Sequence, residues 1–267
     1  MHAIQRDASP FALLDLLGFS AFIESASFDK VWEVLLRLVL ASEEATGRAT
    51  ARGVQRVSSM PGFVIASDTL FMYPDPDADD GFYTVVRSTA RLVRESIVQS
   101  ERLQGSQPFG LLPLRGAISC GSLAVTPAWQ PKGELVVGPV VIGSAVSRAH
   151  RWEQQQKWIG ASVCPISADL IAANHAPELQ RLKDEGYLVE MHVPTANART
   201  KAFAVNYVQS AADAEVLGRM LKKLEAGVDE KLRSKYVEAR RFVEAMLAAN
   251  TFAPLYEEPG SKIRTYF

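Results

Sequence analysis

The chain has 267 residues, of which 48% are apolar, and its 29 basic and 30 acidic residues nearly cancel. This is the composition of an ordinary soluble globular protein, and it lacks the basic field that would point to nucleic acid as a partner. The apolar stretch at 31–41 is interrupted by Glu33 and Arg37, so no segment is expected to span a membrane.

The N-terminal residues and the cysteines indicate the compartment. The first residues contain no apolar signal core, so we expect a cytoplasmic protein. Cys120 and Cys164 lack the spacing of a metal site, and we expect both to be buried free thiols. Nothing in the sequence therefore suggests an oxidising compartment.

The apolar pattern predicts alternating strands and helices along the first 210 residues. In chain order we expect a buried strand at 11–18, one long helix or two shorter ones from 19 to about 45, a hairpin of 50–58 and 62–73, a helix at about 82–103, a strand pair within 114–125, a helix at about 138–156, a strand at 158–165, a short helix at 168–174, and strands near 187–193 and 202–208. This order predicts a ferredoxin-like α/β sandwich. From Ala211 onward the pattern is helical, with Gly227 as the expected break.

Two aspartates, Asp15 and Asp68, each lie inside an apolar segment that is predicted to be a strand. A lone carboxylate among aliphatic side chains is costly to bury unless a cation or hydrogen bonds stabilise it. Two of them on neighbouring strands would form a site for one or two oxygen-preferring divalent metal ions. The first strand runs into Gly18, Phe19 and Ser20 and a helix, where phosphate is favoured. The alternative is that each aspartate only caps a helix or a turn.

Four short motifs occur in order along the chain. They read Leu-Asp-Leu-Leu-Gly-Phe-Ser at 14–20, Ser-Asp at 67–68, Arg-Gly-Ala-Ile-Ser-Cys-Gly at 115–121, and Gly-Ser-Ala-Val-Ser-Arg-Ala-His-Arg at 143–151. In these motifs the chain resembles the class III nucleotidyl cyclases, the family of the adenylate and guanylate cyclases. The resemblance covers roughly residues 10–208. It implies an N-terminal tail at 1–10, a cyclase catalytic domain at 11–210 and a C-terminal helical extension at 211–267.

The chain also departs from the purine cyclases of this family. Where those enzymes read the base with a lysine and an acidic residue, this chain has Val64 and Val140. Ser147 replaces the asparagine that orients the ribose, and Ser67 replaces the glycine of a Gly-Asp pair, whereas Arg151 is retained. This combination resembles the pyrimidine cyclases of bacterial anti-phage Pycsar signalling, which make cyclic UMP or cyclic CMP. We expect a uridylate cyclase that signals to a separate effector; the alternatives are a cytidylate cyclase and an inactive nucleotide-binding module.

The resemblance implies a role for each site residue. Asp15 and Asp68, with Leu16 beside them, would hold two Mn²⁺ or Mg²⁺ ions. Arg151 of the partner subunit in a homodimer would stabilise the charge at the α-phosphate, with Ser147 near the ribose; without the motif, Arg151 would be read as a solvated helix-end arginine. Contacts to a nucleoside triphosphate are implied for Gly18, Phe19, Ser20, Val64, Val140, Arg199 and Lys201.

The charges of the helical extension receive a plainer interpretation. The basic residues Lys222, Lys223, Lys231, Arg233 and Lys235 alternate with acids. Such alternation is typical of a solvated helix face. The extension is expected to support the dimer or to contact a partner.

Overall fold

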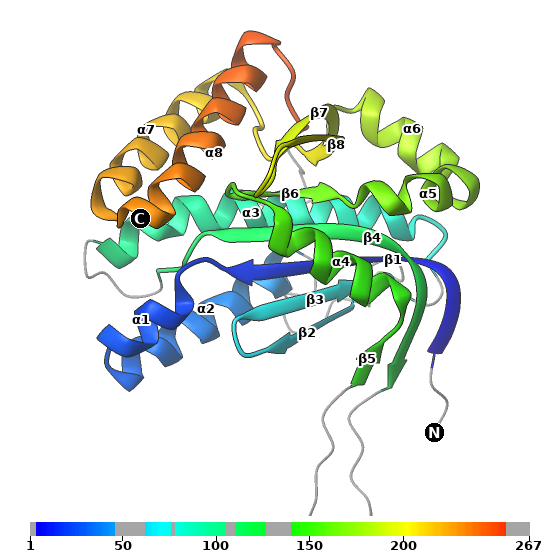
Figure 1. Ribbon diagram of the computed structural model, residues 1–267, viewed down its shortest axis with the longest axis horizontal. Helices are drawn as coiled ribbons and strands as arrows, with labels where there is room; N and C mark the ends of the chain where they lie inside the picture. The colour runs from blue at the N-terminus through cyan, green and yellow to red at the C-terminus, as the bar shows by residue number, and fades with distance from the viewer. Residues whose placement is uncertain (1–3, 46–61, 76–77, 105–109, 127–139, 255–267) are drawn as a thin grey trace, which may run out of the picture.

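The computed structural model of the protein describes residues 4–45, 62–75, 78–104, 110–126 and 140–254. Within these ranges one mixed sheet has the strand order β2-β3-β1-β4-β6-β8-β7, and β5 pairs with β4 beside this path (Figure 1). The strands are β1 (Ile4–Leu16), β2 (Gly62–Ala66), β3 (Thr69–Tyr73), β4 (Leu114–Thr126), β5 (Val140–Ile142), β6 (Gly160–Val163), β7 (Leu188–Pro194) and β8 (Arg199–Val205). The helices are α1 (Phe19–Ser25), α2 (Phe28–Ala45), α3 (Gly81–Gln104), α4 (Ser144–Gln155), the 3₁₀ turn η1 (Pro165–Ser167), α5 (Ala168–Asn174), α6 (Ala176–Asp184), α7 (Ala211–Gly227) and α8 (Glu230–Ala248).

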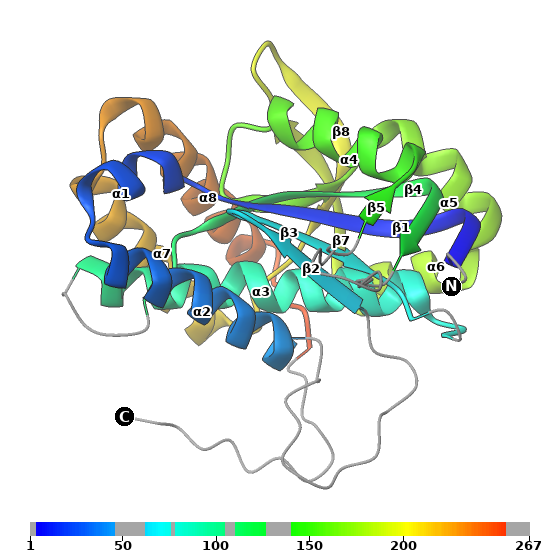
Figure 2. The same cartoon turned by 90° about the horizontal axis from the view of Figure 1, so that it is seen from below.

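Helices cover both faces of this sheet. α2 and α3 lie on one face and α4 on the other, with β1 and β4 between them (Figure 2). Because both faces are covered, apolar residues of β1 and β4 such as Phe11, Leu14 and Ile118 are fully buried whichever way they point. The α/β sandwich predicted from the sequence is confirmed.

The C-terminal helices α7 and α8 are packed onto this sandwich. Asp213 of α7 accepts hydrogen bonds from Arg94 of α3, at 2.7 Å from Nη2 and 3.0 Å from Nε. Leu217 of α7 and Phe242 of α8 are buried in the same hydrophobic core as the sheet. In both views α1, α7 and α8 gather at one end of the sheet, where β1 ends (Figures 1 and 2).

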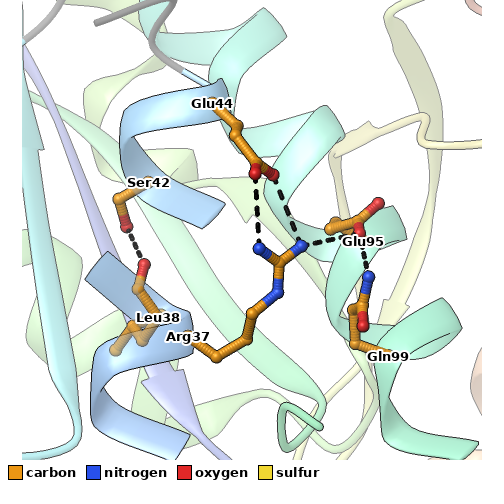
Figure 3. A network of polar contacts seen from close by, with 6 residues as sticks. All are labelled: Arg37, Leu38, Ser42, Glu44, Glu95 and Gln99. Atoms are coloured by element: carbon orange, nitrogen blue, oxygen red, sulfur yellow. Dashed lines mark hydrogen bonds and ion pairs between the residues drawn. The ribbon is translucent and has the colours of Figure 1, made fainter. Parts of the chain in front are cut away.

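Arg37 joins α2 to α3. Its guanidinium pairs with Glu44 of α2 at 3.3 Å and with Glu95 of α3 at 3.2 Å, while Gln99 also donates to Glu95 (Figure 3). The Arg37 side chain is only 11% exposed, so these acids provide the partners that a buried guanidinium needs. Among the described residues, no helix has the length and apolar character needed to cross a membrane.

Two boundaries differ from the predicted ones because of strand pairing. β1 begins at Ile4, so most of the predicted tail at 1–10 is strand, with an irregular register between Arg6 and Ser9. The polar sequence of this segment gives no strand signal, but β4 is long enough to pair with it as far as Val125. The predicted strand 62–73 is two strands joined by a two-residue turn, and its predicted partner at 50–58 lies outside the described residues.

The start of α4 also differs from its predicted position. The predicted helix at 138–156 begins only at Ser144, and Val140 belongs to the short strand β5. Gly143 separates the two elements with φ of 145°, and a Cβ at this position would collide with the carbonyl oxygen of Ser122. A glycine therefore allows the chain to turn from β5 into α4 against β4. The predicted helical region from 19 to 45 is the two helices α1 and α2.

Candidate active site at the end of β1

The structure brings the backbones of the two aspartate motifs together. Asp15 is the next-to-last residue of β1 and pairs with Thr69 of β3, directly after Asp68. The amide of Leu16 donates a hydrogen bond to the carbonyl of Asp68 at 3.1 Å. The charge of Asp68 also acts on the pKa of Asp15. Both carboxylates thus belong to one end of the sheet, as adjacent strands require.

Asp68 reaches this position because it lies in a turn and not within a strand. Ser67 and Asp68 form the two-residue connection between β2 and β3, and Ser67 has φ of 59°. A positive φ at the first turn residue is typical of a type II′ hairpin, where glycine is preferred. Glycine would therefore suit position 67, because serine at this position must adopt a positive φ that is unfavourable for an L-residue.

Arg115 and Glu153 complete the charged surroundings of Asp15. Arg115 lies opposite Asp15 on β4, with Nη2 at 3.7 Å from Oδ2 of Asp15, and it forms a closer ion pair with Glu153 of α4. Arg115 is 11% exposed at its side chain and Glu153 is 4% exposed. Burial, with the negative charges of Glu153 and Asp68, raises the pKa of Asp15 to about 6, although Arg115 and Lys235 act to lower it.

This donor set fits a divalent cation. Three acids share a partly buried region with one paired arginine, so added positive charge would stabilise the ionised form of Asp15. Among the described residues, no group of three or more His, Cys, Asp or Glu side chains is arranged to hold a metal alone. Mg²⁺ in phosphoryl-transfer sites is commonly held by one or two carboxylates together with substrate phosphates. Asp15 and Asp68 fit that arrangement, and Leu16 follows Asp15 directly in the chain.

Two amides before the β1–α1 turn are already used in hydrogen bonds. The amide of Leu16 is bonded to Asp68, and the amide of Leu17 donates to the carbonyl of Pro113 at 2.9 Å. Gly18 has φ of 80° and precedes α1, whose first-turn amides have no acceptor within the helix. The side chain of Phe19 is buried in the core, whereas Ser20 is exposed. The amides of Leu16 and Leu17 are therefore not free for an anion, and the backbone of 18–20 remains the candidate.

Helix α4 holds Ser147 and Arg151 one turn apart on its exposed face. The end of this helix is anchored from inside by buried hydrogen bonds. Gln156 donates to the carbonyl of Gly116 at 2.7 Å, and Ser162 receives the indole N–H of Trp152 at 2.8 Å. This anchoring fixes the direction in which the exposed face points.

The remaining predicted substrate residues lie apart from Asp15. Val64 is half-buried on β2, and Val140 is 41% exposed on β5. Lys201 pairs with Glu190 at 2.5 Å, and Arg199 pairs with Glu238 at 2.7 Å.

The sheet register shows how far the basic residues of β8 lie from Asp15. Arg115 is opposite both Asp15 and Gly160, and Ser162 is opposite Ala204. Lys201 is therefore displaced from the Asp15 row by about five residues, or roughly 16 Å along the strand. The structure does not bring Arg199 or Lys201 to the aspartate pair of the same chain.

Three charged residues near Asp15 were not among the predicted site residues, namely Arg115, Glu153 and Lys235. Glu153 lies on the buried face of α4 and contacts Arg115. Lys235 of α8 acts electrostatically on Asp15, although the sequence placed it on a solvated face. A signal was present, because Leu232, Lys235, Tyr236 and Ala239 follow the i, i+3, i+4, i+7 spacing of a buried helix stripe.

The fold is similar to that of solved structures, although the other comparisons found no match. No family model matches the chain, and no curated protein matches it. The structure is similar to the adenylyl cyclase CyaB from P. aeruginosa, with a TM-score of 0.51 and 13% identity over 77% of this chain and 96% of that one. It is also similar to a bacterial light-regulated adenylyl cyclase (TM-score 0.53, 12% identity, 84% of this chain and 59% of that one).

A third similar structure is the non-canonical dimeric guanylyl cyclase domain of the RhoGC fusion protein from the aquatic fungus Blastocladiella emersonii. Its TM-score is 0.51 at 13% identity, over 77% of this chain and 97% of that one. At such low identity the likeness concerns the fold and not the substrate. The chain has the fold of the class III nucleotidyl cyclase catalytic domains.

Proposed function

We propose that the protein is a nucleotidyl cyclase that converts a nucleoside triphosphate into a 3′,5′-cyclic nucleoside monophosphate and pyrophosphate. The observation that carries this proposal is the convergence of Asp15 and Asp68 at the end of β1, on a fold shared with cyclase domains. Arg115 and Glu153 surround the pair with further buried charge. A partly buried carboxylate whose pKa is raised by burial and by neighbouring acids, as that of Asp15 is, is more typical of a catalytic site than of a structural one.

In the proposed mechanism, Asp15 and Asp68 would hold two divalent ions, Mn²⁺ or Mg²⁺. Bound there, these ions would lower the pKa of the ribose 3′-hydroxyl and neutralise the departing pyrophosphate. The backbone of Gly18, Phe19 and Ser20 would contact the terminal phosphates. Arg115 holds the carboxylate of Asp15 in place through its contacts with Asp15 and Glu153.

We propose further that the active enzyme is a homodimer in which each chain lends Arg151 to the other chain's metal site. Arg151 is exposed and points away from the buried face of α4 that contacts Arg115. A guanidinium from a second chain would stabilise negative charge developing at the α-phosphate, with Ser147 near the ribose. In a symmetric dimer the same contact would occur twice and make two equivalent sites. Arg199 and Lys201 would serve the partner's site in the same way.

For the substrate we propose UTP, with cyclic UMP as a cytoplasmic second messenger in antiviral defence that acts on a separate effector. The support is the resemblance to pyrimidine cyclases at Val64 and Val140, which offer no polar group for reading a purine. CTP is the alternative substrate. A catalytically inactive nucleotide-binding module is the alternative function, favoured by Ser67 and Ser147 at positions where the family has glycine and asparagine.

The test is direct. The purified protein is incubated with each of the four ribonucleoside triphosphates and Mn²⁺, and products are resolved by mass spectrometry. Cyclic UMP from the wild type, lost in both Asp15→Asn and Asp68→Asn, is the expected result. Asp184→Asn, which changes an exposed aspartate on α6, is the matched control and should keep full activity. Absence of any cyclic product from all four nucleotides would exclude the cyclase and leave the binding module.

A further inference from the structure

The N-terminal part of α8 lies on the β1–α1 turn. The Cδ1 atom of Leu232 is 3.4 Å from the position that a Cβ on Gly18 would occupy. Asp229 caps this end of the helix, because its side chain accepts a hydrogen bond from the amide of Leu232 at 2.9 Å. Tyr236, one turn later, is buried in the core. The C-terminal helix is therefore held against the turn to which the proposed function assigns phosphate binding.

The packing of α8 against this turn places Lys235 near Asp15. It follows Leu232 by three residues, so both side chains lie on the same face of α8. Lys235 is half-buried and within electrostatic range of two acids, Asp15 and Glu153, and of one buried cation, Arg115. Burial and the positive charges of Arg115 and Lys157 lower the pKa of Lys235 to about 8.

Lys235 differs in its ion pairing from Arg115, Arg199 and Lys201. Glu153 pairs with Arg115, and the more distant Arg199 and Lys201 pair with Glu238 and Glu190. Within the described part of the chain, Lys235 has no carboxylate at ion-pair distance. A half-buried ammonium without a partner is costly and is stabilised when an anion binds it.

We propose that Lys235 is a substrate-binding residue that contacts the triphosphate of the nucleotide bound at Asp15 and Asp68 of the same chain. This inference rests on the proposed function, which supplies the triphosphate as the anion. It also assigns the C-terminal helical pair to the active site, since α8 packs Leu232 against Gly18 and carries Lys235, on the same face, within electrostatic range of Asp15. A polyanion would provide the partner that Lys235 lacks.

The competing role for Lys235 is that of a counter-ion that only balances Asp15 when no metal is bound. The two roles make opposite predictions for binding. A triphosphate ligand contributes to nucleotide and pyrophosphate affinity. A counter-ion competes with the metal, so its removal would strengthen Mn²⁺ binding and leave phosphate binding unchanged.

The experiment compares Lys235→Met, Lys235→Arg and the control Lys231→Met in the full-length protein. Methionine keeps an apolar stem for packing, and Lys231 is an exposed lysine one turn earlier on α8. Calorimetry measures binding of Mn²⁺ alone, of pyrophosphate with Mn²⁺, and of α,β-methylene-UTP with Mn²⁺. Thermal unfolding of each variant shows that α8 remains packed.

We expect Lys235→Met to weaken binding of pyrophosphate and of the nucleotide about tenfold or more, because a charge-assisted hydrogen bond is lost. Lys235→Arg should retain most of the affinity, and Lys231→Met all of it. The inference would be overturned if Lys235→Met and Lys231→Met weakened pyrophosphate binding equally. It would also be overturned if Lys235→Met left pyrophosphate and nucleotide binding unchanged, or if its only effect were tighter binding of Mn²⁺. If the wild type forms no cyclic nucleotide but Lys235→Met still weakens pyrophosphate and nucleotide binding, the binding role of Lys235 is upheld and the cyclase activity is refuted.

Discussion

Glu153 and Arg151 lie two residues apart on α4 and face opposite sides of it. Glu153 is buried against Arg115, which in turn lies beside Asp15, whereas Arg151 is exposed. Two residues correspond to a rotation of about 200° around a helix. The inward direction of Glu153 therefore turns Arg151 away from the Asp15 of its own chain. This orientation supports the proposal that Arg151 acts at the metal site of another chain.

Complementation between two inactive variants tests this shared site. Asp15→Ala and Arg151→Ala should each be inactive, but an equal mixture that exchanges subunits should regain about one quarter of wild-type activity. Half of the dimers would be mixed, and one of the two sites in each mixed dimer would be intact. The measurement is cyclic nucleotide formation after subunit exchange, which a size or tag-based assay verifies. Exchange without any recovery of activity would place Arg151 in a role within its own chain.

The valines at 64 and 140 should determine the choice of base. UTP or CTP should be used about 100-fold better than ATP or GTP, because neither valine can hydrogen-bond a purine edge. The double variant Val64→Lys/Val140→Asp should reduce this preference for pyrimidine over purine nucleotides. Val64→Met, which stays apolar, should leave the preference unchanged. The comparison is of kcat/KM for the four nucleotides. Similar values for ATP and UTP in the wild type would show that these positions do not select the base.

Ser67→Gly should stabilise the protein. Ser67 has φ of 59°, a backbone conformation that costs an L-residue about 1 kcal/mol and glycine little. We expect the free energy of unfolding in urea to rise by about 0.5–1 kcal/mol. Ala66→Gly, at the neighbouring strand position, is the control and should lower it by a similar amount. A loss of stability in Ser67→Gly would mean that the serine side chain contributes more than its backbone costs.

His175 should make the free energy of unfolding decrease as the pH rises into the alkaline range. Burial disfavours the imidazolium, but hydrogen bonds with Cys120, Glu178 and the carbonyl of Ala8 outweigh burial and raise the pKa of His175 to about 10. A folded-state pKa above the unfolded value of 6.5 stabilises the protein fully below pH 6.5, and this contribution is lost as pH rises through 10.

The corresponding measurement is urea unfolding of wild type and His175→Gln at pH 6, 8 and 10. Wild type should lose about 2 kcal/mol over this range from this residue, a value that allows for solvent screening at a partly exposed group. His175→Gln should be less stable than wild type at pH 6 and should approach it at pH 10. Parallel pH profiles of the two proteins would show that the imidazole is neutral in the folded state.

The C-terminal helical extension should be a structural part of the domain. Asp213 is 8% exposed and holds Arg94 through short hydrogen bonds, so Asp213→Ala leaves a partly buried guanidinium without its acid. We expect a loss of about 3 kcal/mol in unfolding free energy. The control is Glu190→Ala, which breaks the exposed pair with Lys201 and should cost less than about 1 kcal/mol. Equal small losses would indicate that α7 packs only loosely on α3.

Much of the fold and part of the candidate site could be predicted from local patterns. The apolar segment around Asp15, the helical spacing of α3 and the break at Gly227 are each encoded within a few consecutive residues. Period, turn residues and charge within one segment are local properties, so they indicate the element without knowledge of its neighbours. The choice of Asp15, Asp68 and Arg151 as site residues depended on such segments and their order along the chain.

Other features depended on contacts between distant segments, which no local pattern contains. The strand register placed Lys201 about 16 Å along the sheet from the Asp15 row. The length of β4 made residues 4–10 a strand, although their own sequence is polar. The folding back of α8 onto the β1–α1 turn converted Lys235 from an apparent surface charge into a half-buried neighbour of Asp15. The sequence by itself determined most of the elements and the acids they carry. Tertiary packing decided which charges surround those acids, because electrostatic interactions depend on distance in space and not along the chain.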